Sequence, residues 1–172
     1  MISRNILFTG LPGCGKTTLV EKIVKKMGKP AGGFVTREIR EKGRRVGFTI
    51  NTLDGKQGLL AHRRINSRYR VGKYGVDINV MDRIAVPAMM PEHPDDLVVI
   101  DEIGKMECFS PLFKKALTNL LDSANPVFGS ISLKGDAFIR GIRARDDVTV
   151  VQVTDQNRDG LVDIYAGAVL RV

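Results

Sequence analysis

One segment near the start of the chain most constrains what the chain can fold into. It reads Gly10-Leu11-Pro12-Gly13-Cys14-Gly15-Lys16-Thr17, which has the form G-x-x-x-x-G-K-[ST]. The apolar run 6–8 precedes it and a helical pattern follows it, as a loop between a strand and a helix requires. Backbone N–H groups of such a loop, together with the positive end of the helix dipole, surround an anion. The segment therefore predicts a phosphate-binding loop for a nucleoside triphosphate.

The residue types of this loop suit distinct tasks. Glycine lets successive N–H groups turn inward, the Lys16 ammonium reaches the β- and γ-phosphates, and the Thr17 hydroxyl is a ligand for Mg²⁺. Mg²⁺ is the only cofactor that the sequence predicts. The predicted nucleotide-binding residues of the loop are Gly10, Leu11, Pro12, Gly13, Cys14, Gly15, Lys16, Thr17 and Thr18.

A second chemical signal follows the apolar run 97–100, which is typical of a strand buried on both faces. Asp101 ends that run in the manner of a Walker B carboxylate and is the second predicted Mg²⁺ ligand. Glu102 is placed to take a proton from a water in line with the γ-phosphate, so it is the predicted general base and favours hydrolysis over phosphoryl transfer to an acceptor. Lys105 and Glu107 either form a solvated pair or align the loop of Glu102.

The remaining pattern indicates one domain, residues 1–172, with an α/β fold. Helices alternating with apolar strands predict a three-layer sandwich with a mainly parallel sheet, of the RecA-like P-loop class, with ligands at the carboxyl ends of the strands. An antiparallel meander at about 33–76 is inserted, and the gap between the two motifs leaves room for an extra strand between their strands. The expected strands are 34–39, 46–52, 58–61, 71–76, 126–131 and 148–153, and the expected helices are 16–27, 80–89, 111–121, 136–143 and about 159–170.

The motifs together resemble the small nucleoside-triphosphatase family, whose members include thermophile enzymes and the cancer-related nucleoside-triphosphatase. The resemblance covers nearly the whole chain and is carried by the phosphate loop and by residues 33–38, 44–48, 101–107 and 153–158. It implies a RecA-like fold and slow Mg²⁺-dependent hydrolysis of ATP, GTP, CTP and UTP to the diphosphate and phosphate. Cys108 and Phe109, and a heavier basic segment at 63–73, depart from the family's usual pattern without touching a catalytic position.

Other candidates follow from the framework. Ser130, near the end of its strand, either senses the γ-phosphate or is satisfied by backbone groups. Arg143 and Arg145 either supply positive charge to the γ-phosphate or simply complement the end of a helix dipole; we take Arg143 as the catalytic candidate. Asn157 and Arg158 follow the last expected strand, where many phosphate-loop folds contact the base; Asn157 alternatively forms a turn.

The charge distribution suggests a further partner. Residues 37–73 hold eleven Lys or Arg and three acids, so this segment carries the whole formal net charge of +8. Such a face attracts nucleic acid or another polyanion, steers triphosphate toward the loop, or is simply solvated. Tyr69 and Tyr74 are interleaved with its last basic cluster, as base stacking requires.

Two alternative functions therefore stay beside the triphosphatase. They are a nucleotide or nucleoside kinase and a nucleic-acid-binding protein with regulatory hydrolysis. No apolar run is long enough for a membrane span or a leader, so a cytoplasmic protein without membrane contact is expected. The spacing of Cys14 and Cys108 indicates neither a zinc site nor a disulfide.

Overall fold

The central element is a nine-stranded sheet, which a computed structural model places within the described residues 3–28 and 31–169. The strand order is β5-β6-β4-β3-β2-β7-β8-β1-β9. The parallel part contains β1 (Asn5–Thr9), β2 (Ala31–Glu41), β7 (Leu97–Ile103), β8 (Val127–Ile131) and β9 (Val148–Gln152). The antiparallel part contains β3 (Arg44–Thr52), β4 (Gln57–His62), β5 (Arg70–Val71) and β6 (Tyr74–Val76).

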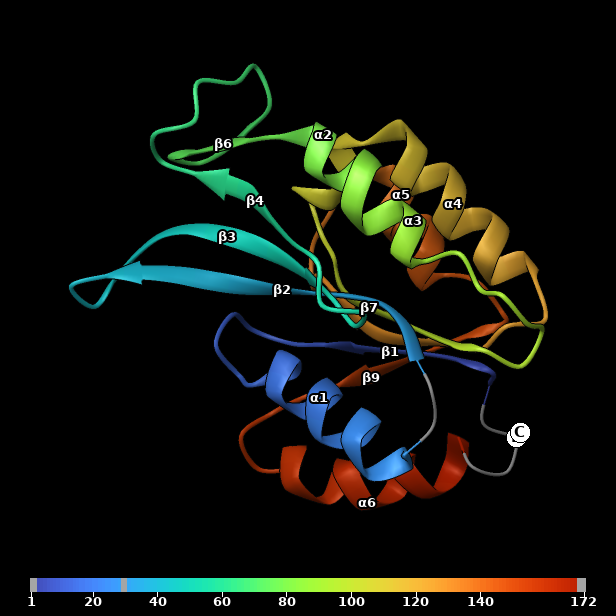
Figure 1. Ribbon diagram of the computed structural model, residues 1–172. Helices are drawn as coiled ribbons and strands as arrows, with labels where there is room; N and C mark the ends of the chain where they lie inside the picture. The colour runs from blue at the N-terminus through green and yellow to red at the C-terminus, as the bar shows by residue number, and fades with distance from the viewer. Residues whose placement is uncertain (1–2, 29–30, 170–172) are drawn as a thin grey trace.

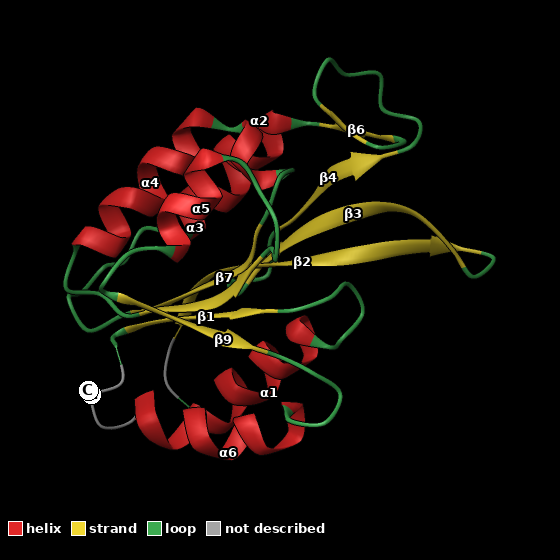
Figure 2. Ribbon diagram, turned by 180° about the vertical axis from the view of Figure 1, so that it is seen from behind, coloured by secondary structure: helices red, strands yellow, loops and turns green. Residues whose placement is uncertain are grey.

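Helices cover both faces of this sheet (Figures 1 and 2). On one face, α1 (Lys16–Met27) packs beside α6 (Arg158–Val169). The opposite face carries α2 (Ile78–Val80), the π-helical η1 (Met81–Ala85), α3 (Val86–Ala88), α4 (Pro111–Asp122) and α5 (Ala137–Arg143). Each face buries its own apolar cluster, one around Ile23 and Phe128 and the other around Phe34 and Phe113. The predicted three-layer α/β fold with an antiparallel insertion is confirmed.

The strand between the two motif strands comes from a later part of the chain than the gap between the motifs. β8 lies between β1 and β7 and is the strand that follows the Asp101-Glu102 pair along the chain. The gap instead supplies β2, on the outer side of β7, and the whole meander. The length of the gap was therefore a misleading guide to the strand order.

The meander projects beyond the carboxyl ends of the parallel strands. Val35 of β2 is paired with Asp101 of β7, so residues 36–41 continue past the acidic pair, and the β2–β3 hairpin extends away from the body (Figure 1). The strand expected over 71–76 is two short strands, because Gly72 adopts a positive φ of 55° and turns the chain between β5 and β6. A basic hairpin thus lies at the end of the meander.

Three helical segments begin directly after a side-chain cap. Side chains of Asp77, Ser110 and Asp136 each accept a hydrogen bond from a backbone N–H in the first turn that follows, as N-caps do. The second predicted helix begins at Ile78, two residues earlier than expected. Leu112 of α4 is 52% exposed although its side chain is apolar.

The end of the last helix and the question of a membrane span can be compared with the structure only within the described residues. Leu170, the predicted end of the last helix, lies outside them, and α6 is described as far as Val169. Within the described residues, no helix is both long and apolar enough to cross a membrane.

Candidate active site

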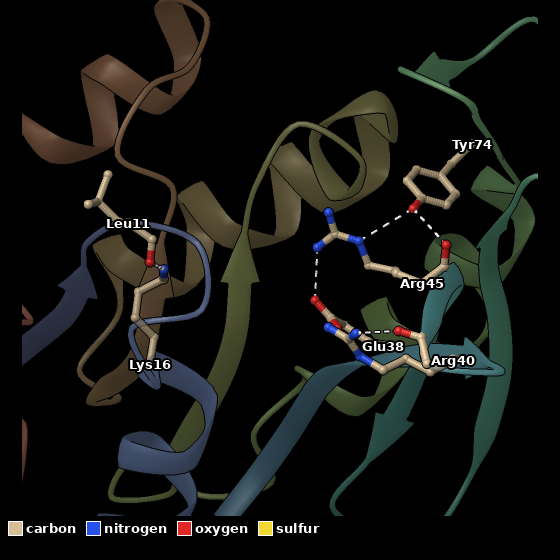
Figure 3. A network of polar contacts seen from close by, with 7 residues as sticks. Leu11, Lys16, Glu38, Arg40, Arg45 and Tyr74 are labelled. Atoms are coloured by element: carbon tan, nitrogen blue, oxygen red, sulfur yellow. Dashed lines mark hydrogen bonds and ion pairs between the residues drawn. The ribbon is translucent and has the colours of Figure 1, made fainter. Parts of the chain in front are cut away.

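The phosphate loop joins β1 to α1 as the motif predicts. Gly13 and Gly15 adopt positive φ angles of 80° and 92°, which residues with a Cβ rarely tolerate, and Gly15 is the N-cap of α1. The Nζ atom of Lys16 is buried within the loop, where it donates to the carbonyl oxygen of Gly10 (2.9 Å). It also donates to the carbonyl oxygen of Leu11 (3.1 Å), which lies beside it in Figure 3. The loop therefore holds its own cation beside the helix N-terminus, the arrangement that suits a polyphosphate.

Asp101 lies at the carboxyl end of β7 and is almost completely buried. Its Oδ1 atom accepts a hydrogen bond from the Ser130 hydroxyl on the neighbouring β8. Its Oδ2 atom is also buried but has no partner at hydrogen-bonding geometry within the described residues. Burial raises the pKa of Asp101, and nearby Ser130, Thr17 and Lys16 partly offset that rise. The structure thus brings together the two residues predicted as Mg²⁺ ligands, Thr17 and Asp101.

The structure gives Ser130 a role that differs from both sequence interpretations, which were sensing of the γ-phosphate and hydrogen bonding to backbone groups. Its hydroxyl is fully buried and donates to the Asp101 carboxylate. That contact fixes the orientation of Asp101 and leaves Oδ2, rather than Oδ1, without a hydrogen-bond partner. We therefore describe Ser130 as a positioning residue for Asp101.

Glu102 follows Asp101 at the end of β7 and is half-buried. Burial raises the pKa of its carboxyl, the negative charge of Asp101 raises it further, and the positive charge of Lys16 acts in the opposite direction. A carboxylate with a raised pKa is a stronger base than one in water. The environment of Glu102 therefore makes its carboxylate a better proton acceptor than that of an exposed glutamate.

Glu107 is buried, contrary to its interpretation as half of a solvated pair with Lys105. It begins the 3-10 segment η2 (Glu107–Phe109), and its Oε1 atom accepts a hydrogen bond from the Thr36 hydroxyl of β2 (3.3 Å). Burial, followed by the charge of Glu102, raises the pKa of Glu107 to about 8. Lys105, by contrast, is exposed.

Gly104 shows that the carboxyl groups of Glu102 and Glu107 converge. A Cβ atom at Gly104 would lie 3.0 Å from Oε1 of Glu102 and 2.9 Å from Oε2 of Glu107. Both distances are shorter than normal contacts, so a side chain at this position would displace the two carboxyl groups. The chain therefore folds Glu107 back beside the predicted base, which agrees with the alternative interpretation that Glu107 aligns the loop of Glu102.

The two candidate arginines have different surroundings. Arg143 donates from Nη1 to Oγ1 of Thr9 (2.9 Å), the last residue of β1, and to the carbonyl of Ser132 (3.2 Å), just after β8. It therefore lies at the carboxyl ends of the strands, next to the start of the phosphate loop. Arg145 instead pairs with Asp122 and with Asp147, which precedes β9. That position is at the opposite end of the strands, so Arg145 is not part of the site.

Asn157 forms a turn. Its Oδ1 atom accepts from the backbone N–H of Thr154 (2.8 Å), and its Nδ2 atom donates to the carbonyl of Gln152 (2.9 Å). Both ends of the amide are used within this loop, which corresponds to the turn-forming alternative rather than to base contact. The neighbouring Arg158 lines a cavity of about 190 Å³ beside Gly15, at the boundary between α1 and α6.

Two residues of this site were not among the sequence candidates. Thr9 contacts Arg143, and Thr36 contacts Glu107. Thr9 offered one usable signal, because it is a hydroxyl residue at the end of an apolar strand, where the ligands of α/β proteins bind. Thr36 lies in the middle of β2 and offered no such signal.

Comparisons with known proteins agree with this geometry. A family model described as NTPase matches residues 5–165. The chain belongs to this NTPase family. The nucleoside-triphosphatase THEP1 of Thermotoga sp. (strain RQ2) is 42% identical over 159 residues, covering 92% of this chain and 91% of the relative. The human cancer-related nucleoside-triphosphatase is 39% identical over 178 residues and 94% of each chain.

Solved structures of NTPase-family members have the same fold. The crystal structure of THEP1 from Aquifex aeolicus superposes with a TM-score of 0.88 at 32% identity, covering 96% of this chain and 98% of that one. The solution structure of the human protein gives 0.81 at 38% identity, covering 97% of each chain. The resemblance predicted from the sequence is thus confirmed, and the names of these relatives describe hydrolases.

Proposed function

We propose that this member of the NTPase family hydrolyses nucleoside triphosphates to the diphosphate and phosphate with the help of Mg²⁺. The observation that carries the proposal is the meeting of three groups at one edge of the sheet: the phosphate loop with Lys16, the buried Asp101, and Glu102 beside it. The relatives' names support the reaction class. ATP, GTP, CTP and UTP are the proposed substrates. The site as we propose it contains no contact, among the described residues, that would select one base over another.

The metal proposal rests on the unpartnered Oδ2 atom of Asp101. A buried carboxylate oxygen without a hydrogen-bond partner, beside the Thr17 hydroxyl, matches the hard oxygen ligands that Mg²⁺ prefers. Mg²⁺ bound to a nucleotide needs only one or two protein oxygens, because phosphates and waters supply most of its ligands. When bound, Mg²⁺ neutralises charge on the β- and γ-phosphates.

We assign the catalytic steps to three side chains of this protein. Lys16 exchanges its contacts with the loop carbonyls for the β- and γ-phosphate oxygens. Glu102 takes a proton from a water whose oxygen bonds to the γ-phosphorus, while the bond from that phosphorus to the bridging oxygen breaks and the diphosphate leaves. Arg143, anchored on Thr9 beside the loop, supplies positive charge to the γ-phosphoryl oxygens.

The rest of the nucleotide is assigned to the cavity beside Gly15. It adjoins the N-terminus of α1 and is lined by Thr18, Lys22 and Arg158 among others. Arg158 lies near the loop, since its Nη1 atom is 3.3 Å from the position of a Cβ atom at Gly15. Its guanidinium offers a planar face for stacking on a base of any type. The sequence suggested a base contact for the loop of Asn157 and Arg158, and we assign that contact to Arg158.

Phosphate release by the purified chain tests this function. Each of the four triphosphates is incubated with Mg²⁺ or with EDTA, and then with added nucleosides and nucleoside monophosphates. We expect phosphate from all four only with Mg²⁺, at a rate that acceptors do not change. Transfer to an acceptor without phosphate release in its absence would instead show a kinase, and equal release in EDTA would remove Mg²⁺ from the proposal.

A further inference from the structure

The excess positive charge lies on two neighbouring hairpin tips. One is the turn between β2 and β3, and the other is the segment 63–73 that leads into and forms the β5–β6 hairpin. Both project from the body at the meander side of the molecule (Figure 1). We call the exposed cations of these tips the basic tip surface, which consists of Lys42, Arg44, Arg45, Arg63, Arg64, Arg68, Arg70 and Lys73.

Side-chain contacts join the two tips into one surface. Nη2 of Arg63 pairs with Oε2 of Glu41, which is on β2, at 3.1 Å. The Tyr74 hydroxyl of β6 donates to the carbonyl of Arg45 (3.2 Å) and accepts from Nε of the same arginine (3.3 Å) (Figure 3). Because these contacts hold the tips together, their cations lie within reach of a single extended ligand.

The acids of this region are too few to neutralise it. Glu38 pairs with both Arg40 (2.7 Å) and Arg45 (2.8 Å), and Glu41 lies 3.1 Å from Arg63 and 3.9 Å from Arg64. Each carboxylate is thus already shared between two guanidinium groups. The members of the surface without a carboxylate partner in the part of the chain that the structure describes are Lys42, Arg44, Arg68, Arg70 and Lys73. A concentrated positive potential of this kind attracts polyanions.

The composition of the surface favours phosphodiesters over a lipid bilayer. Six of its eight cations are arginine, whose planar guanidinium matches phosphate oxygens with two parallel hydrogen bonds. Proteins that lie on membranes add exposed apolar side chains to their basic residues. None of the large exposed apolar residues of the described chain belongs to this surface.

The tyrosine side chains of this region determine whether a bound nucleic acid could be recognised by stacking on its bases. Tyr74 is only 8% exposed. Tyr69 packs against Phe109 with ring centroids 5.4 Å apart, and the Arg68 guanidinium also lies over the Tyr69 ring, 4.9 Å from its centroid. Neither ring is free to stack on bases, contrary to the support that the sequence suggested. We propose that the basic tip surface binds the phosphate backbone of nucleic acids without selecting a base sequence. This binding is separate from triphosphate hydrolysis.

A salt-dependent binding assay with labelled oligonucleotides tests this proposal. Fluorescence anisotropy is recorded for a 30-nucleotide RNA and the DNA of the same sequence between 50 and 200 mM NaCl. For about five phosphate contacts, at a slope of about −0.7 each on single strands, we expect affinity to fall about 100-fold over this range. Two RNAs of equal length and different sequence are expected to bind equally.

Two matched variants locate the binding site. The variant Lys42→Glu/Arg44→Glu/Arg70→Glu reverses three unpaired cations, and the control Lys25→Glu/Lys115→Glu/Arg140→Glu reverses three exposed cations on α1, α4 and α5. Both change the net charge equally. We expect the tip variant to lose at least about tenfold in affinity at 50 mM NaCl with a shallower salt slope, and the control to stay within about threefold of wild type. If the tip variant fails to fold by circular dichroism, Arg44→Ala/Arg70→Ala replaces it.

Several results would overturn the proposal. Absence of oligonucleotide binding at 50 mM NaCl is one, and an equal loss of affinity in both variants, which would reflect net charge alone, is another. Equally tight binding of polyglutamate would show a surface without preference for phosphate. Binding to vesicles of phosphatidylserine and phosphatidylcholine without binding to oligonucleotides would assign the surface to a membrane.

Discussion

The buried carboxyl of Glu107 makes folding stability depend on pH, and Glu107→Gln tests this directly. Burial and the neighbouring Glu102 raise the pKa of Glu107 from 4.5 to about 8. The folded state therefore holds this proton more tightly than the unfolded state. The resulting contribution to stability is fully present below the unfolded pKa and is lost as pH rises through the folded pKa.

The size of the effect follows from the shift. Each unit between the two pKa values corresponds to about 1.4 kcal/mol, so the wild-type chain should lose roughly 2–3 kcal/mol from this group between about pH 5 and 7. Glutamine has nearly the same shape as the neutral acid but does not titrate. We therefore expect the free energy of unfolding of Glu107→Gln, relative to wild type, to rise by about 1.4 kcal/mol per pH unit over this interval.

Urea unfolding at pH 5, 6, 7 and 8, in EDTA and without nucleotide, measures this difference. Glu92→Gln, at an exposed position, is the matched control and should give a difference that does not vary with pH. A difference between Glu107→Gln and wild type that stays constant within about 0.5 kcal/mol would refute the reasoning, because Glu107 would then not be held in its neutral form.

Three further substitutions probe the same edge of the sheet. Gly104→Ala places a methyl group against the carboxyl groups of Glu102 and Glu107, so the turnover of the folded variant should fall about 10- to 100-fold; unchanged turnover would contradict this placement. Ser130→Ala removes the hydrogen bond to Asp101, and urea unfolding should show a loss of about 1–3 kcal/mol together with a weaker Mg²⁺ titration of activity. Arg143→Ala should lower kcat on the order of 10³-fold with nucleotide affinity nearly unchanged. A variant with the kcat of wild type would exclude Arg143 from catalysis.

The parts of the fold that the sequence predicted well are those set by local pattern. The phosphate loop, the buried strand that carries Asp101, and the helix starts capped by Ser110 and Asp136 depend on residues close together in the chain. Apolar periodicity and capping chemistry report these features directly. The position of β8 between β1 and β7 depends instead on long-range pairing, which the spacing between motifs does not encode.

The contacts within the site required the three-dimensional structure. The burial of Glu107 follows from the turn at Gly104 and from the register that brings Thr36 of β2 beside it, neither of which is visible as a motif. Arg143 and Arg145 look equivalent in the sequence, yet their side chains extend to opposite ends of the strands. Local chemistry therefore identified the candidate residues, and tertiary register decided which of them share one site.

The measurement that tests the central claim most directly is the turnover and nucleotide affinity of Glu102→Gln. Glutamine keeps the size of the side chain but cannot accept the proton, so kcat for phosphate release should fall by about 10² to 10⁴. The dissociation constant of a fluorescent triphosphate, measured separately by titration, should stay within about threefold of wild type, because the lost interaction exists only in the transition state. Turnover equal to that of wild type in a folded Glu102→Gln protein would contradict the assignment of Glu102 as the general base.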